Sequence, residues 1–210
     1  MQADVFRAWI TAAARVIEEQ RDHLTQLDAA IGDADHGINL SRGFTAVLSA
    51  LESAAPATPG AVLTLTGATL ISKVGGASGP LYGTAFRGAG KALGDSTDVD
   101  LPGLAAALDA ALAGVQRLGA AREGDKTMVD ALAPATGAFS KAVAEGASDA
   151  EALTALVDAA QAGAMATIPM QALKGRASYL GPRSVGHEDP GAASTALILA
   201  VLRDAALAGQ

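Results

Sequence analysis

Apolar residues recur at steps of three and four along most of the chain, and this spacing limits the fold more than any other feature. The recurrence is clearest in two stretches, which contain Val5, Phe6, Trp9, Ile10, Ala13, Val16 and Ile17 and then Leu101, Leu104, Leu108, Leu112, Val115 and Leu118. Such spacing puts the apolar side chains on one face of an α-helix. Similar stretches run at about 38–53, 61–74, 80–93, 128–144, 150–167 and 191–207. We therefore expect eight helices, and because no segment alternates convincingly between apolar and polar residues, we expect an all-α fold.

Residues that favour helix starts support three of these boundaries. Thr58, Asp100 and Asp149 each stand where an N-cap residue is expected, just before a helical stretch. Alanine fills the helices and aromatic residues make up only 3% of the chain, so we expect helices that pack closely around small side chains. The connections at 54–60 and 94–100 are short enough to be ordinary loops. We expect one domain over residues 1–210.

Charge and composition argue against several classes of protein. The formal net charge is −7 and no block of Lys and Arg is present, so we expect no nucleic-acid partner. The chain has no cysteine, hence no disulfide framework or thiolate metal site, which suits a cytoplasmic protein. Asp4 and Arg7 interrupt the start of the chain, which argues against a signal peptide. The longest apolar run, 195–202, is far shorter than the roughly 20 residues of a membrane span, so we expect no membrane association.

Three carboxylates fall within eight residues of one another, just before the helix expected from Ile38. Asp28, Asp33 and Asp35 would repel one another in a turn unless a cation lay between them. Clustered hard oxygen ligands are what Mg²⁺ takes, usually together with phosphate oxygens. One alternative is an Asx-rich turn that only caps the helix. Three converging Asp favour the metal, so the segment points to a metal–nucleotide site.

A glycine-rich turn runs from Gly75 to Pro80 and enters a helix. Free backbone N–H groups at such a turn can bind an anion, with help from the helix dipole. The alternative is a tight corner between two helices. The turn is not a Walker A motif, because no Gly-Lys-Ser/Thr follows.

Two later loops also carry polar residues. In the turn 124–128, Asp125 or Thr127 is expected to cap the next helix, while Gly119 and Met128 could line an adenine slot. The segment 175–191 has low helical propensity and is long for a connector, which is typical of a functional loop. Arg176 is its candidate phosphate ligand, and Asp189, before Pro190, could equally cap a helix or contact a ligand.

Taken in order, the loops 27–43, 75–83, 124–128 and 174–191 resemble those of the ADP-binding L subunit of bacterial, phosphotransferase-system-dependent dihydroxyacetone kinase. The resemblance covers nearly the whole chain. It implies an antiparallel eight-helix closed barrel, with ADP and two Mg²⁺ at one rim. It also implies a cytoplasmic complex, with a K subunit that holds dihydroxyacetone and an M subunit that delivers phosphoryl groups. A homodimer is also expected.

The resemblance implies a role for particular residues of this sequence. Asp28, Asp33 and Asp35 match the Mg²⁺ ligands, and Arg176 matches the phosphate-binding arginine, to which we assign the catalytic role. The remaining matches are to nucleotide-binding positions, namely His36, Gly37, Ile38, Asn39, Ala77, Ser78, Gly119, Met128, Asp189, Pro190 and Gly191.

Two other functions stay open from the sequence. The same fold serves ATP-dependent dihydroxyacetone kinases, in which ATP is a diffusing substrate. A helical module that binds a nucleotide or a lipid without catalysis is the other alternative, because a barrel with small side chains could enclose an apolar cavity.

Overall fold

The computed structural model describes residues 1–209, so Gln210, the last residue of the expected domain, lies outside the described residues. The described part contains nine α-helices, one 3-10 helix and no strand, which confirms the all-α prediction. The helices are α1 Ala3–Glu19, α2 Arg21–Ile31, α3 His36–Ala54, α4 Pro59–Lys73, α5 Ser78–Leu93, α6 Leu101–Gly119, α7 Val129–Ala144, α8 Asp149–Ala166, the 3-10 helix η1 Arg176–Ser184, and α9 Pro190–Ala208.

Helix α2 was not expected. Its apolar residues Leu24, Leu27 and Ile31 do follow helical steps of three and four, but the segment has only 11 residues and runs into the acid cluster, which the sequence analysis interpreted as a turn. The 3-10 helix η1 was not expected either, because Gly181 and Pro182 lie within it and both residue types disfavour helices.

The structure corrects one predicted cap and confirms two. Thr58 accepts from Ala61 N and Asp100 from Gly103 N, as expected of N-cap residues. Helix α8, however, is capped by Ser148 and not by Asp149: Ser148 and Glu151 form a reciprocal capping box.

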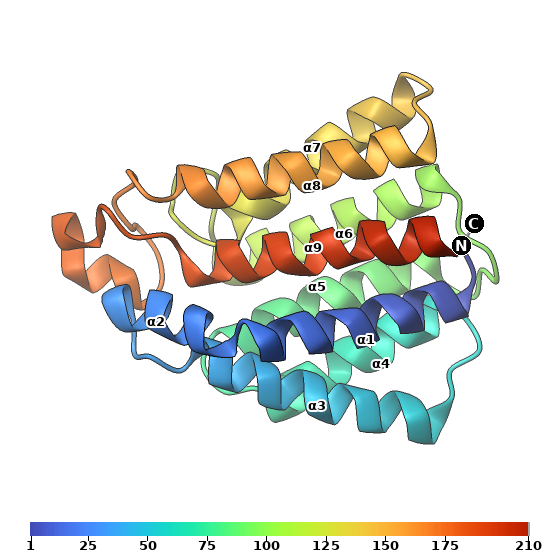
Figure 1. Ribbon diagram of the computed structural model, residues 1–210, viewed down its shortest axis with the longest axis horizontal. Helices are drawn as coiled ribbons and strands as arrows, with labels where there is room; N and C mark the ends of the chain where they lie inside the picture. Colours follow the sequence, from blue (N-terminus) through green and yellow to red (C-terminus); the bar gives the residue numbers. More distant parts are fainter. Residues whose placement is uncertain (210) are drawn as a thin grey trace.

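The long helices run alongside one another, along the horizontal direction of Figure 1, so that helix ends gather at two opposite ends of the molecule. Each long helix packs on the next in the order α1, α3, α4, α5, α6, α7, α8, α9, and α9 packs back on α1. This is the order that a closed barrel requires, although the closed barrel itself stays a prediction. One large core fills the interior, with Phe6, Trp9, Phe44 and Phe86 among its buried aromatic residues.

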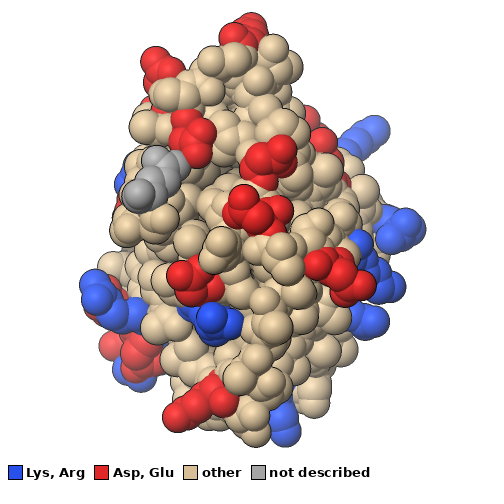
Figure 2. Space-filling model, turned by 90° about the vertical axis from the view of Figure 1, so that its right-hand side faces the viewer, with Lys and Arg blue, Asp and Glu red and all other residues tan. Residues whose placement is uncertain are grey.

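The two ends of the molecule carry different elements. Acidic side chains are spread over the end where the chain termini lie (Figure 2). The opposite end carries α2, η1 and the start of α9 (Figure 1). Helix α9 is long and apolar enough to span a membrane, but half of it is buried in the bundle, as in a core helix of a globular protein.

Candidate functional site

A cleft of about 180 Å³ opens at the end that carries α2 and η1. Its lining comes from the α2–α3 turn, the start of α5, the loop before α7, the start of η1 and the start of α9. The four loops singled out from the sequence therefore meet at one place. This convergence depends on the up-and-down order of the helices, because α3, α5, α7 and α9 all begin at this end.

The three aspartates converge at one side of the cleft. Asp28, Asp33 and Asp35 each offer an oxygen within 4.8 Å of the others. Between the last two, Ala34 adopts a left-handed backbone with φ of 62°, a conformation that costs a non-glycine residue about 1–2 kcal/mol. Strain of this kind is typical of functional sites. Asp28 also shapes the turn, because its Oδ2 accepts from Asp35 N at 2.8 Å and from His36 N at 3.2 Å.

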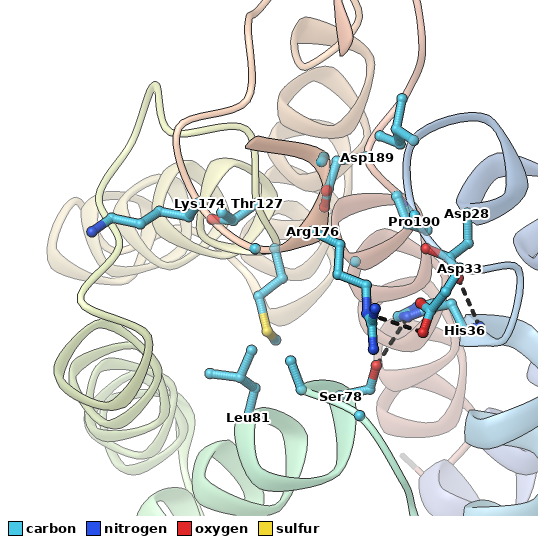
Figure 3. A pocket seen from close by; sticks show the side chains of 18 of the residues that line it. Asp28, Asp33, His36, Ser78, Leu81, Thr127, Lys174, Arg176, Asp189 and Pro190 are labelled. Atoms are coloured by element: carbon cyan, nitrogen blue, oxygen red, sulfur yellow. Dashed lines mark hydrogen bonds and ion pairs between the residues drawn. The ribbon is translucent and has the colours of Figure 1, made fainter. Parts of the chain in front are cut away.

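Arg176 reaches this cluster from η1. Its Nε lies 3.0 Å from Asp33 Oδ2, and Figure 3 shows the side chain pointing toward Asp33. The side chain of Arg176 is 68% exposed, so the pair is solvated and contributes little to stability. Gly175, just before it, has φ of 65°, which only glycine adopts easily. Arg176 is thus held beside the carboxylates by a solvated contact that a ligand can replace.

His36 lies buried behind the aspartates and connects two helices. Its Nδ1 lies 3.0 Å from Ser78 Oγ at the start of α5, and its Nε2 lies 2.8 Å from Ser194 Oγ on α9. Burial lowers the pKa of His36 to about 4, against a smaller raising effect of Asp28. Next to Ser194, Tyr82 donates or accepts at 2.7 Å, and burial raises the pKa of Tyr82 to about 12.

Lys126 lines the cleft, and the sequence analysis did not single it out. Its side chain is buried, and its ammonium donates to the carbonyl oxygens of Thr167, at 2.7 Å, and His187. Burial lowers the pKa of Lys126, while Asp189 and Asp130 raise it. The ammonium thereby joins the loop before α7 to both ends of the long segment that separates α8 from α9. The sequence carries no feature that marks Lys126, because its unusual positive φ of 62° is visible only in the structure.

Asp189 caps α9 and lines the cleft, so both roles left open by the sequence are compatible with its position. Its Oδ2 accepts from Ala192 N at 2.8 Å. Burial raises the pKa of Asp189 to about 7.

In the loop before α7, Asp125 does not cap the helix, although the sequence predicted that it could: its Oδ2 accepts from Arg122 N. Thr127 does not cap it either: its Oγ1 accepts from Val129 N at 3.2 Å, but the N-cap residue of α7 is Met128, which makes no side-chain cap hydrogen bond.

Eleven of the fifteen predicted site residues line the cleft, and four do not. Gly37 is buried against the backbone of Arg21, where a Cβ would meet the carbonyl oxygen at 2.0 Å. Asn39 accepts from Arg42 Nη2. Ile38 is exposed and Gly119 lies at the end of α6 near Leu81. Cleft residues that the sequence analysis did not assign to the site include Leu81, Tyr82, Lys126, Thr127 and Lys174.

Comparison with known families agrees with this geometry. The model of the DAK2 domain matches residues 30–204. The chain belongs to the DAK2 family. The matched residues of the DAK2 domain include all of the cleft lining except Asp28.

Two curated relatives of this DAK2 chain match it nearly end to end. The "PEP-dependent dihydroxyacetone kinase, ADP-binding subunit DhaL" of Escherichia coli (strain K12) is 42% identical over 198 residues, 94% of each chain. The corresponding subunit of dihydroxyacetone kinase 1 from Listeria innocua is 43% identical over 190 residues, 90% of each chain. Both relatives are therefore of nearly the same length as this chain.

A solved structure has the same fold within a longer chain. It is the dihydroxyacetone kinase from C. freundii in complex with AMP-PNP and Mg²⁺, with a TM-score of 0.73 and 29% sequence identity. The match covers 97% of this DAK2 chain but only 34% of that kinase. The chain thus spans about a third of the length of the solved kinase.

Proposed function

We infer that the chain is the ADP-binding subunit of a phosphoenolpyruvate-dependent dihydroxyacetone kinase, and that it forms one domain. The observation that carries this proposal is the convergence of three aspartates, an arginine and the starts of α3 and α5 in one cleft. The nearly end-to-end match to subunits of that name supports it. In this function, bound ADP receives a phosphoryl group from a phosphorylated M subunit and passes it to dihydroxyacetone on a K subunit.

The residues of the cleft fit a bound Mg²⁺. Asp28, Asp33 and Asp35 supply hard oxygen ligands close enough to share one or two ions, and the proposal takes two. When bound, Mg²⁺ supplies positive charge to the phosphate oxygens. The solved kinase with AMP-PNP and Mg²⁺ supports this choice of metal and of nucleotide.

The chain's own groups then position the phosphates. Arg176 is placed to turn its guanidinium from Asp33 to a phosphate, where a planar fork can bind two oxygens. The backbone N–H groups at the start of α5 favour negative charge there. Charge in phosphoryl transfer develops on the equatorial oxygens, so fixed donors of this kind lower the barrier. No side chain of this subunit needs to be phosphorylated.

The surface around the cleft fits a protein partner. Large hydrophobic side chains are exposed at this end of the described chain and not at the other, namely Ile38, Ile71, Leu118, Met165, Leu173, Tyr179 and Val185. Exposed apolar side chains that gather at one end of a molecule can mark a docking surface. We assign this surface to the K and M subunits. The homodimer and the cytoplasmic location remain predictions.

Two alternative functions can be compared with the cleft. An L subunit of an ATP-dependent kinase would need the same carboxylates. It would differ from the proposed function only in its kinetics, because ATP would bind and leave as a substrate in each turnover. A lipid-binding module would need room between the helices. The apolar cavity beside Trp9, Phe86 and Leu132 is about 50 Å³, close to the space of one or two waters. An acyl chain would therefore require the helices to separate.

Calorimetry with Mg·ADP tests the proposal. We expect saturable binding that a chelator abolishes, and at about a thousandfold excess over Kd the nucleotide should stabilise the fold by roughly 4 kcal/mol. A protein that binds no Mg·ADP would overturn the site. Alone, the chain should not phosphorylate dihydroxyacetone. Continuous turnover from ATP with the K subunit alone would favour the ATP-dependent alternative.

A further inference from the structure

A row of hydrogen-bonding side chains runs from the cleft into the core. Ser78 lines the cleft and lies 3.0 Å from His36 Nδ1. On the other side of the ring, Nε2 lies 2.8 Å from Ser194 Oγ. Ser194 Oγ also lies 2.7 Å from the hydroxyl of Tyr82 and 2.9 Å from the carbonyl oxygen of Pro190. Each hydroxyl has one hydrogen to donate, so the donors of this row can be counted.

The count favours one tautomer of His36 in the ligand-free protein. A neutral imidazole carries its single ring proton on Nδ1 or on Nε2. With the proton on Nε2, the ring donates to Ser194, and Ser194 donates to the carbonyl of Pro190. Ser78 then donates to Nδ1 and Tyr82 donates to Ser194, so both ring contacts and the contact to Pro190 have a donor. The carbonyl oxygen of Gly191, which lies 3.0 Å from the Tyr82 hydroxyl and 3.2 Å from Ser194 Oγ, is left to the hydroxyl of Thr195 at 2.8 Å. With the proton on Nδ1, Ser194 must donate to Nε2, and the bond to Pro190 is lost.

A phosphate oxygen in the cleft demands the opposite arrangement. While Ser78 donates to His36, its oxygen turns lone pairs toward the cleft, and a phosphate oxygen can only accept. If Nδ1 carries the proton, the ring donates to Ser78 Oγ and the hydroxyl hydrogen of Ser78 is free. A bond from this hydroxyl to an anion is stronger than the neutral bond from Ser194 to Pro190 that is given up.

We propose that nucleotide binding moves the ring proton of His36 from Nε2 to Nδ1, with Ser194 as the positioning residue that sets the ligand-free tautomer. The proposal rests on the proposed function, because it needs a phosphate beside Ser78. The step is balanced. Water takes up the proton that leaves Nε2, cleft water returns one to Nδ1 through the hydroxyl of Ser78, and the hydroxyl of Ser194 turns from the carbonyl of Pro190 to Nε2. The protein takes up and releases no net proton.

Nitrogen-15 NMR of the histidine rings tests this directly, because couplings to the carbon-bound ring protons show which nitrogen is protonated. The chain has three histidines, so His23→Gln and His187→Gln assign the signals of His36. The spectra compare protein treated with a chelator and protein saturated with Mg·ADP. We expect a proton on Nε2 in the first state and on Nδ1 in the second.

The outcomes separate this proposal from the proposed function. If calorimetry detects Mg·ADP binding while the same nitrogen stays protonated in both states, the tautomer exchange is wrong and the function stands. If no Mg·ADP binds, the function fails and this proposal fails with it. A proton on Nδ1 in the ligand-free wild-type protein would also overturn it.

A matched pair of serine variants tests the role of Ser194. Ser194→Ala removes the acceptor of Nε2–H, so His36 should carry its proton on Nδ1 already without ligand and show no exchange with Mg·ADP. Ser140→Ala is the control, because the Ser140 hydroxyl is buried on α7 without a hydrogen-bond partner. The control should keep the wild-type exchange. A ligand-free Ser194→Ala protein with the proton still on Nε2 would refute the positioning role.

Discussion

At the scale of single residues, we expect the fold not to need the charges of Asp33 and Asp35. Asp33 is exposed and pairs only with the solvated Arg176, and Asp35 is half-buried. We expect Asp33→Asn and Asp35→Asn to weaken Mg·ADP binding at least about tenfold, or 1.4 kcal/mol. The free energy of unfolding should change by less than about 0.5 kcal/mol, as for other surface substitutions. Calorimetry and urea unfolding measure the two quantities.

Asp109→Asn is the matched control for these variants, because Asp109 is exposed on α6 away from the cleft. It should leave both quantities unchanged. If Asp33→Asn unfolds the ligand-free protein, the aspartates serve to cap and shape the turn, and their assignment to a metal is wrong.

Asp189 and His36 have pKa values that burial shifts in opposite directions. The pKa of Asp189 rises from 3.8 to about 7, so its stabilising contribution is complete below pH 3.8 and is lost as pH rises to about 7. The pKa of His36 falls from 6.5 to about 4, so its contribution is lost as pH falls from 6.5 to about 4. Between about pH 4 and 6.5, a rise in pH therefore increases the free energy of unfolding through His36 and decreases it through Asp189.

Replacing Asp189 should therefore expose the histidine contribution. Asp189→Asn keeps an oxygen for the cap of α9 but cannot titrate. Between about pH 4.5 and 6.5, its free energy of unfolding should rise relative to the wild-type value by about 1.4 kcal/mol per pH unit. Urea unfolding of ligand-free protein across this range measures the slope. Parallel curves for variant and wild type would show that Asp189 is ionised at these pH values.

At the scale of elements, Lys126 connects the loop before α7 to the segment between α8 and α9. Replacing it with methionine keeps the apolar stem but leaves the carbonyls of Thr167 and His187 without their donor. We expect Lys126→Met to lower the free energy of unfolding by about 2–4 kcal/mol. Amide hydrogen exchange should also accelerate within 168–189. Lys141→Met, at an exposed site on α7, is the control and should cost less than about 0.5 kcal/mol.

Helices α4 and α5 approach each other through glycines. A Cβ on Gly83 would lie 2.3 Å from Ile71 Cγ1 and 2.7 Å from the carbonyl oxygen of Gly67. We expect Gly83→Ala to destabilise the protein by about 1–3 kcal/mol, in spite of the better helix propensity of alanine. Gly137→Ala is the matched control, because a Cβ there meets nothing within 4 Å. It should stabilise by about 0.5–1 kcal/mol in the same urea titration.

At the scale of the whole molecule, we expect nucleotide binding and partner docking to be separable functions of the end that carries the cleft. Tyr179 is 89% exposed and Leu173 is 55% exposed beside the cleft. We expect the double variant Tyr179→Ser, Leu173→Ser to weaken binding of the K subunit at least about tenfold, because a few large side chains, Tyr prominent among them, carry most of the energy of an interface. Its affinity for Mg·ADP should stay unchanged.

The control for docking lies at the other end of the molecule. Glu52 and Asp95 are exposed in the region that carries the acidic side chains, so Glu52→Ser, Asp95→Ser should not alter K-subunit binding. If the control weakens the complex and the double variant does not, the partner docks on the acidic end. Pull-down with purified K subunit and calorimetry give both affinities.

The sequence by itself determined the helical class, most helix ranges and the residues of the acid cluster. Helical periodicity is a local property, and Asp28, Asp33 and Asp35 are close in sequence, so neither needed a tertiary contact to be noticed. Helix α2 was missed although Leu24, Leu27 and Ile31 follow a helical step, because it has only 11 residues and runs into the acid cluster, which was interpreted as a turn. The cap of α8 was assigned one residue late, since Ser148 and Asp149 are both good cap residues and only hydrogen-bond geometry distinguishes them.

Only the tertiary structure decided how the loops combine. It brought Ser78 and Ser194 to opposite sides of the His36 ring, although these residues are far apart in the chain. It also buried Lys126 against two distant carbonyls, and it left Gly119 outside the cleft lining. These relationships depend on which helices become neighbours. That choice is made by packing over the whole core, and the period of any single helix does not contain it.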